Sequence, residues 1–204
     1  MKTTTRFLLL AALITPLAAE EPVSRPLFNG MDLTGWNGQN YIVEDGAIVS
    51  TPKGRNLVTE ETFTNYILEF EFKLPPAGNN GLGIHYPGEG DGAYTGMELQ
   101  ILDNTAKKYA KLKDYQFHGS LYTLQAAKRE GLKAVGEWNQ QKVTVNGSSV
   151  IVVLNGVEIL NANLDELAKA HPKHKGVLRR SGHIAFLGHG NKVAFRNIRI
   201  AEIK

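Results

Sequence analysis

The segment Tyr66–Leu74 is the feature that most restricts the fold of this chain. Every second residue is apolar, and charged residues stand between the later ones: Tyr66, Leu68, Phe70, Phe72 and Leu74 alternate with Ile67, Glu69, Glu71 and Lys73. Successive residues of a strand point to opposite faces, so this pattern predicts a strand with one face in an apolar core. Pro75-Pro76 ends it, because proline cannot donate a hydrogen bond to a neighbouring strand.

Short alternating segments of this kind recur along the chain and are separated by turn sequences. Asp45-Gly46 and Asn155-Gly156 are pairs that favour the tight turns of β-hairpins. Leu164–Ala170 is the one segment predicted to be a helix, with Asn163 as its N-cap. Many short strands and one short helix predict an all-β fold, a jelly-roll β-sandwich of two antiparallel sheets.

The first 19 residues have the pattern of a secretory signal peptide. Lys2 and Arg6 precede the apolar run Phe7–Ile14, and small residues follow at Ala18-Ala19, after which we expect cleavage. The run is shorter than the roughly 20 residues that span a bilayer. We therefore expect a periplasmic or secreted protein without membrane contact after processing; an uncut membrane anchor is the alternative.

The mature chain is predicted to be one domain, residues 28–204, after an N-terminal linker, residues 20–27. Loss of Lys2 and Arg6 leaves 21 basic and 20 acidic residues, so the net charge is +1. That balance gives no reason to expect nucleic acid as a partner. The chain has no cysteine, so its stability cannot depend on disulfides.

Polar residues gather in the stretch Asn79–Asn104, where two alternating segments flank a glycine-rich loop. The first segment places Leu82, Ile84 and Tyr86 on one face and Gly83 and His85 on the other. The second places Met97, Leu99 and Ile101 towards the core and Glu98 and Gln100 on the opposite face. We predict that His85, Glu98 and Gln100 share one face of a sheet with His189, at the floor of one pocket. An ordinary solvated outer face is the alternative.

A carboxylate, an amide and imidazoles beside aromatic loops suit a carbohydrate site, because rings meet apolar sugar faces and polar groups bind hydroxyls. The candidate catalytic residues are Glu98, His85, His189 and His118, and the candidate substrate-binding residues are Gln100, Tyr122, Trp36 and Tyr86. Of the two tryptophans, Trp138 is predicted to be core, whereas Trp36 suits a core or a site equally.

Two common catalytic arrangements find less support. Glu98 and Asp103 are the obvious carboxylate pair of a glycosidase, but their odd spacing places them on opposite sides of a regular strand, and only a bulge would unite them. His85, Glu98 and His189 are possible ligands of a divalent metal ion, although their spacing is not compact. No cofactor is firmly predicted.

Several motifs in order resemble one family. They are NNGLGIHYPGEGDGAYTGMELQILDN, YQFHGSLY, VGEWN, VLNGVEIL, GHIAFLGHG and FRNIRI, and they extend from about Phe28 to Ile203. The resemblance is to the domain of unknown function 1080 family, described as 3-keto-disaccharide hydrolases or 3-keto-glycoside lyases/hydratases. Some members read Gln-Asp-His-Gly where this chain has Leu187-Gly188-His189-Gly190, so this chain lacks the polar pair before the histidine.

The resemblance implies a concanavalin A-like jelly roll, export and a glycoside substrate that is oxidised at C3. The C3 ketone would acidify the C2 hydrogen, so one base could begin β-elimination of the C1 oxygen, and water could then add back. Glu98 and the histidines would share the base and acid roles, in an order left open, while Gln100, Tyr122 or a bound cation would stabilise the enolate. A non-catalytic carbohydrate-binding module is the alternative, and a structural or protein-interaction sandwich is a third.

Overall fold

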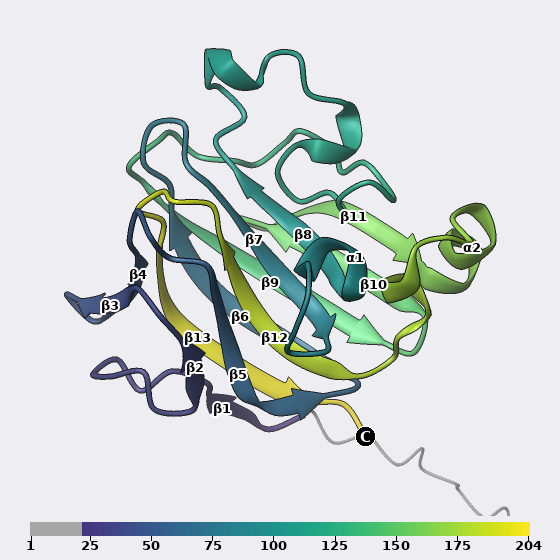
Figure 1. The fold of residues 1–204 in the computed structure, drawn as a ribbon, viewed down its shortest axis with the longest axis horizontal. Coiled ribbons are helices and arrows are strands. Elements are labelled where there is room, and N and C mark those ends of the chain that lie inside the picture. Colours follow the sequence, from purple (N-terminus) through teal and green to yellow (C-terminus); the bar gives the residue numbers. More distant parts are fainter. Residues whose placement is uncertain (1–21) are drawn as a thin grey trace, which may run out of the picture.

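The structure is a computed structural model that describes residues 22–204, so the predicted signal peptide lies outside the described residues. The described chain forms two antiparallel sheets that face each other across an apolar core (Figure 1). The predicted all-β sandwich is therefore confirmed. No helix in residues 22–204 is long and apolar enough to cross a membrane.

The larger sheet has eight strands. Seven follow one another in the order β11 (Val157–Asn163), β10 (Ser149–Leu154), β9 (Trp138–Asn146), β6 (Tyr66–Lys73), β13 (Ala194–Glu202), β4 (Ala47–Ser50) and β3 (Tyr41–Glu44). The eighth, β1 (Ser24–Pro26), pairs with β13. Part of the stretch that we predicted as a linker is thus a strand of this sheet.

The smaller sheet carries the candidate site on its outer face. Its strand order is β2 (Trp36–Gly38), β5 (Asn56–Phe63), β12 (Gly182–Gly188), β7 (Asn79–Tyr86) and β8 (Met97–Leu102). The short helix α1 (Gly92–Thr95) belongs to the β7–β8 connection and lies against both strands (Figure 1). The predicted helix is α2 (Leu164–Ala170), and the Asn163 side chain accepts hydrogen bonds from two amides of its first turn.

Aromatic side chains fill the space between the sheets. The inward residues of β6 are all buried, as the alternation predicted. Phe186 of β12 stacks on Phe195 of β13 with ring centroids 3.8 Å apart, which joins the two sheets. Burial of each such side chain contributes about 1.5–3 kcal/mol relative to leaving it exposed.

Trp36 takes one of its two predicted places, the core, whereas Trp138 differs from the prediction. Trp36 is 5% exposed, stacks on Phe186, and donates a hydrogen bond from Nε1 to the Leu27 carbonyl oxygen at 2.9 Å, so it is core rather than substrate-binding. Trp138 is half-buried on the outer face of the larger sheet, beneath the Arg196 guanidinium. The prediction of Trp138 as core is wrong, because the inward face of β9 begins one residue later, at Asn139.

Both neighbours of β12 contain a β-bulge at the same level. Between His183 and Ala185, β12 advances by two residues, while β7 advances from Gly83 to Tyr86 and β5 from Val58 to Thr62. A bulge of one extra residue breaks the two-residue alternation and turns the following side chains to the other face. In β7 the one extra residue therefore reverses the parity, whereas the two extra residues of β5 preserve it, and Leu57, Thr59 and Phe63 are all buried.

Candidate functional site

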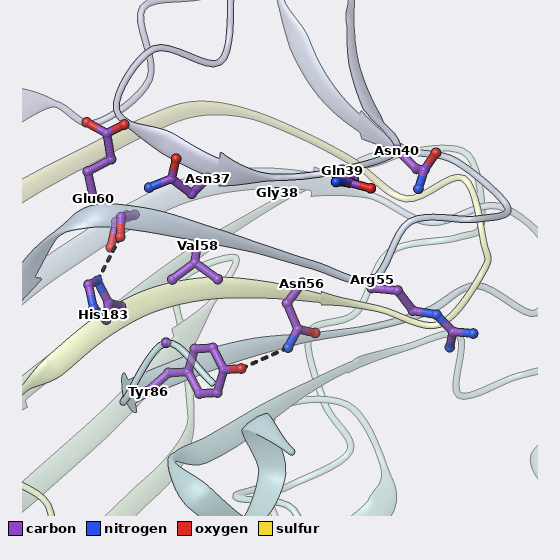
Figure 2. Close-up of a pocket in the computed structure, with 12 residues that line it drawn as sticks. Asn37, Gly38, Gln39, Asn40, Arg55, Asn56, Val58, Glu60, Tyr86 and His183 are labelled. Carbon is purple, nitrogen blue, oxygen red and sulfur yellow. Dashed lines mark hydrogen bonds between the residues drawn. The ribbon is translucent and has the colours of Figure 1, made fainter. Parts of the chain in front are cut away.

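The outer face of the smaller sheet is hollowed in two places. The smaller hollow, of about 220 Å³, lies over β7 and β8, and we call it the Glu98 pocket; among its lining residues are Asn79, Tyr94, Glu98, Gln100, Tyr122 and His189. The larger, of about 660 Å³, lies over β2 and β5, and we call it the β2–β5 cleft (Figure 2). The β7–α1 loop contributes residues to both, with Gly88 in the cleft and Asp91 in the pocket.

Glu98 is positioned by a glycine on the neighbouring strand. Its strand partner is Gly83, and its carboxylate leans over Gly81, where an added Cβ would lie only 1.9 Å from Oε1. The side chain is 5% exposed, and Oε1 accepts no hydrogen bond from the described residues. A buried carboxylate oxygen without a partner is costly for folding, so its position calls for a functional explanation.

His189 faces this carboxylate from the loop that follows β12. Its Nε2 atom lies 3.6 Å from Glu98 Oε1, and its side chain is 48% exposed. One member of the pair is therefore buried at the floor of the pocket and the other lies at its mouth. Such a pair can pass a proton between the floor and an incoming ligand.

Two further polar side chains are fixed by hydrogen bonds. Gln100 donates from Nε2 to Asn79 Oδ1 at 3.0 Å. The Tyr122 hydroxyl accepts from Gln116 Nε2 at 3.0 Å, which leaves its own proton available to an oxygen in the pocket.

The sequence reasoning missed Asn79, Gln116 and Tyr94. Asn79 and Gln116 became recognisable only once their partners were placed. Tyr94 is 48% exposed on α1 at the pocket wall. Partial burial raises the pKa of Tyr94, and neighbouring acidic groups act in the same direction, which keeps the phenol protonated.

The two residues before His189, Leu187 and Gly188, make packing contacts with neighbouring segments. A Cβ on Gly92 of α1 would lie 2.8 Å from the Leu187 side chain, so Leu187 supports the α1 loop from below. A Cβ on Gly188 would lie 2.6 Å from the Arg55 carbonyl oxygen, so the backbones approach closely there. Leu187 and Gly188 thus make contacts that hold the loop and β12 in place.

His85 does not share the face of Glu98, so that prediction is wrong. The β7 bulge gives His85 a φ of +49° and turns its ring away from the pocket. The side chain is buried against Tyr66, and its nitrogens lie 3.1 Å from the Arg179 carbonyl oxygen and 3.2 Å from that of Thr64. Burial lowers the pKa of His85, although these hydrogen bonds oppose the shift.

His118 and Tyr86 also lie outside the Glu98 pocket. His118 is buried against Phe72 between the sheets, and burial lowers its pKa to about 4, so it lies in the core rather than at the site. The bulge brings Tyr86 to the outer face, where it lines the β2–β5 cleft. Asp103 bonds to the Ala77 amide and to Thr105, and it does not line the Glu98 pocket.

Of the three predicted metal ligands, two lie close together in the structure. Glu98 and His189 lie together, and His85 is elsewhere. Within residues 22–204 no group of three or more His, Asp or Glu side chains is arranged to hold one ion.

Comparisons with known proteins agree with a carbohydrate-related site. Residues 23–201 match the model of the 3-keto-alpha-glucoside-1,2-lyase-like domain. A relative from Bacteroides thetaiotaomicron, named 3-keto-disaccharide hydrolase, is 29% identical over 223 residues, which cover 85% of this chain and 76% of the relative. A crystal structure of a proposed glycosyl hydrolase from Parabacteroides distasonis aligns with a TM-score of 0.78 at 26% identity and covers 89% of this chain and 94% of that one.

A more distant similarity concerns the fold alone. The carbohydrate binding module CBM66 from Bacillus subtilis aligns with a TM-score of 0.52 at 12% identity, over 82% of this chain and 96% of the module.

Proposed function

This chain belongs to the 3-keto-alpha-glucoside-1,2-lyase-like domain family, and from that premise we propose that it cleaves glycosides whose sugar is oxidised at C3. The observation that carries the proposal is the buried Glu98 carboxylate, with one oxygen unpartnered among the described residues and His189 3.6 Å away. The name of the Bacteroides relative supports a 3-keto-disaccharide as the substrate.

The proposed reaction is β-elimination followed by hydration. The C3 ketone acidifies the hydrogen at C2, and a base removes it as a proton, which leaves an enolate. The enolate electrons then form the C1–C2 double bond, the bond from C1 to the glycosidic oxygen breaks, and that oxygen leaves with its electron pair and takes up a proton. Water adds across the double bond with OH at C1 and H at C2, so the net reaction is hydrolysis.

Glu98 is the proposed base and His189 the proposed acid. The floor position of Glu98 suits removal of a ring proton, and the exposed position of His189 suits a leaving group that departs towards solvent. A positioned acid or base contributes about 10²–10⁴-fold to a rate. After elimination, the two groups can exchange roles to activate water and return a proton to C2.

Tyr122 and Gln100 are proposed to hold the ketone. Because the Tyr122 oxygen accepts from Gln116, its hydroxyl can donate to the ketone oxygen as that oxygen gains charge. Gln100 is held by Asn79 and would orient a neighbouring hydroxyl. The volume of about 220 Å³ lies below the roughly 300–1,000 Å³ of drug-sized ligand sites, which suits one sugar ring.

The decisive variant is Glu98→Gln, which keeps size and removes the charge. We expect turnover of a 3-keto-glycoside, followed as released aglycone, to fall by about 10²–10⁴-fold with the melting temperature near that of the wild type. The control Glu69→Gln makes the same change on the outer face of the larger sheet and should retain activity. A binding module would show no turnover in any of the three proteins. Unfolding of Glu98→Gln, with normal activity per folded molecule, would make Glu98 structural.

Export is a separate proposal that rests on the signal-peptide pattern of residues 1–19. We propose a periplasmic or secreted mature protein that begins at Glu20. The mass of the mature chain tests the cleavage site, and recovery of full-length protein from the membrane fraction would favour the uncut anchor instead.

A further inference from the structure

The β2–β5 cleft is larger than the Glu98 pocket and chemically different from it. Four of its lining residues have amide side chains, and one cation and one carboxylate lie among the others: Asn37, Gln39, Asn40, Asn56, Arg55 and Glu60 (Figure 2). Amides both donate and accept hydrogen bonds, as sugar hydroxyls do. One cation and one carboxylate balance each other, so the lining does not favour a charged ligand.

His183 presents a fixed acceptor to this cleft. Its Nδ1 atom lies 2.7 Å from the Thr59 carbonyl oxygen and 3.2 Å from that of Glu61. Carbonyl oxygens only accept, so Nδ1 carries the hydrogen and Nε2 of the neutral ring is an acceptor. Nε2 faces Gly88, where an added Cβ would lie 3.5 Å from it. A ligand O–H can therefore be bound here.

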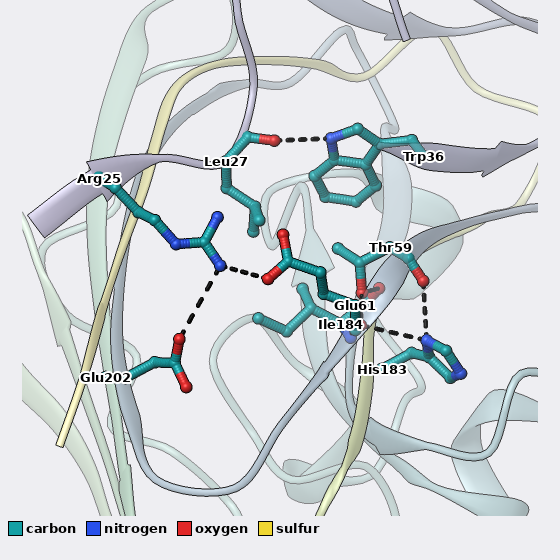
Figure 3. A network of polar contacts seen from close by, with 8 residues as sticks. All are labelled: Arg25, Leu27, Trp36, Thr59, Glu61, His183, Ile184 and Glu202. Carbon is teal, nitrogen blue, oxygen red and sulfur yellow. Dashed lines mark hydrogen bonds and ion pairs between the residues drawn. The ribbon is translucent and has the colours of Figure 1, made fainter. Parts of the chain in front are cut away.

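A network on β5 keeps these carbonyls in place (Figure 3). The Thr59 hydroxyl donates to the Glu61 carbonyl oxygen at 2.8 Å and accepts from the Ile184 amide at 3.1 Å. The Glu61 carboxylate pairs with Arg25 of β1 at 2.5 Å. These contacts hold the β5 bulge, so the orientation of His183 does not depend on a bound ligand.

A second fixed group of the cleft is the Asn56 side chain of β5. Asn56 donates from Nδ2 to the Tyr86 hydroxyl at 3.1 Å, and that hydroxyl donates to the Gly90 carbonyl oxygen at 3.0 Å (Figure 2). This orientation leaves Asn56 Oδ1 as an acceptor. Val58 and the Tyr86 ring supply apolar surface between the polar groups.

We propose that the β2–β5 cleft is a second saccharide-binding site, which holds a neutral, hydroxyl-rich sugar unit through His183 Nε2, Asn56 and the amides of Asn37 and Gln39. Its volume of about 660 Å³ lies within the usual range of ligand sites. Binding there does not require a ketone, and it does not depend on cleavage in the Glu98 pocket. A glycan long enough to reach from the Glu98 pocket to the cleft would contact both sites.

Calorimetric titration with neutral oligosaccharides tests the site. The probes are maltopentaose, cellopentaose, laminaripentaose, mannotetraose and galactotetraose, none of which carries a ketone in its ring. We expect saturable binding of at least one by the wild type and by Glu98→Gln. The double variant Asn37→Ala/Gln39→Ala changes two exposed side chains and should raise the Kd about 10-fold, since each neutral hydrogen bond contributes about 0.5–1.5 kcal/mol. Asn146→Ala, at the exposed end of β9, is the matched control and should bind normally.

Imidazole nitrogen signals report where the probe binds. Saturation should shift the Nε2 resonance of His183 and leave that of His189 in place. The proposal is overturned if no probe binds saturably, if the double variant binds like the wild type, or if His189 shifts while His183 does not. None of these results affects the test of cleavage with a 3-keto-glycoside. The second saccharide site and the cleavage reaction can therefore be refuted independently.

Discussion

Gly81→Ala should inactivate the protein without unfolding it. The added methyl carbon would lie 1.9 Å from Glu98 Oε1 and 2.6 Å from its carboxylate carbon. Ordinary contact begins at about 3.4 Å, so the carboxylate must retreat by about 1.5 Å. A misplacement of about 1 Å can cost 10²-fold in rate. We therefore expect kcat/KM on a 3-keto-glycoside to fall at least about 10²-fold, or about 2.7 kcal/mol of barrier.

Gly83→Ala is a matched control on the same strand and the same outer face. Its methyl carbon would meet Ala185 Cβ at 3.3 Å, a contact that a small shift relieves, and its three nearest atoms belong to Ala185 and Leu187 and not to Glu98. We expect nearly full activity. Replacing glycine where the backbone permits alanine changes stability by about 1 kcal/mol or less, which chemical denaturation will measure.

The assay is kcat and KM for both variants, measured with denaturant unfolding of the same preparations. The expected pattern is a loss concentrated in kcat for Gly81→Ala, because the base is displaced while most of the pocket is unchanged. A folded Gly81→Ala protein with wild-type kcat/KM would refute the reasoning, since the position of the Glu98 carboxylate would then not matter.

Three further predictions concern stability. The buried His118 stays neutral in the fold, while the same histidine in the unfolded chain is protonated below about pH 6.5. Its contribution to the free energy of unfolding, about 3 kcal/mol in total, is therefore present above pH 6.5 and lost as the pH falls towards 4. Urea unfolding across this range should show a shallower dependence of that free energy on pH for His118→Gln, and an unchanged slope would contradict this. A Cβ on Gly176 would lie 1.6 Å from the Gly96 carbonyl oxygen, so Gly176→Ala should cost about 1–3 kcal/mol and lower the melting temperature by several degrees; a wild-type melting temperature would show that the loops separate freely. Asn163→Ala removes the α2 cap and should cost about 1 kcal/mol in denaturant unfolding, whereas equal losses in the exposed control Asn161→Ala would contradict a capping role.

Local sequence patterns were sufficient to predict the β-sandwich and the face of the site that carries Glu98 and Gln100. The alternation around Phe70 predicted β6, and Asn163 predicted the start of α2. Glu98 and Gln100 share a regular strand, so their common face followed from parity. His189 was predicted beside them from the residue types and the resemblance, and the structure places it 3.6 Å from Glu98.

The remaining site residues could not be predicted because their positions depend on long-range pairing. The bulge beside His85 arises from the register of β7 against β12. No residue near His85 in the sequence predicts that the following side chains point to the other face. His183 was missed for the same reason, since its orientation is set by carbonyls of the distant strand β5. Trp36 sits in a turn-rich segment whose burial becomes apparent only once Phe186 lies against it.

The β7–α1 loop has a consequence for how such a protein can change its substrates. The loop rises from the sheet between the two hollows and is tied down by a few contacts, from the Tyr86 hydroxyl to Gly90, from Leu187 to Gly92 and from His174 to Ala93. The two hollows are therefore separated by a loop, whereas their floors are formed by strands. Insertions or deletions in that connection can merge or divide the two compartments and alter the length of glycan accommodated, while the paired strands beneath keep their register.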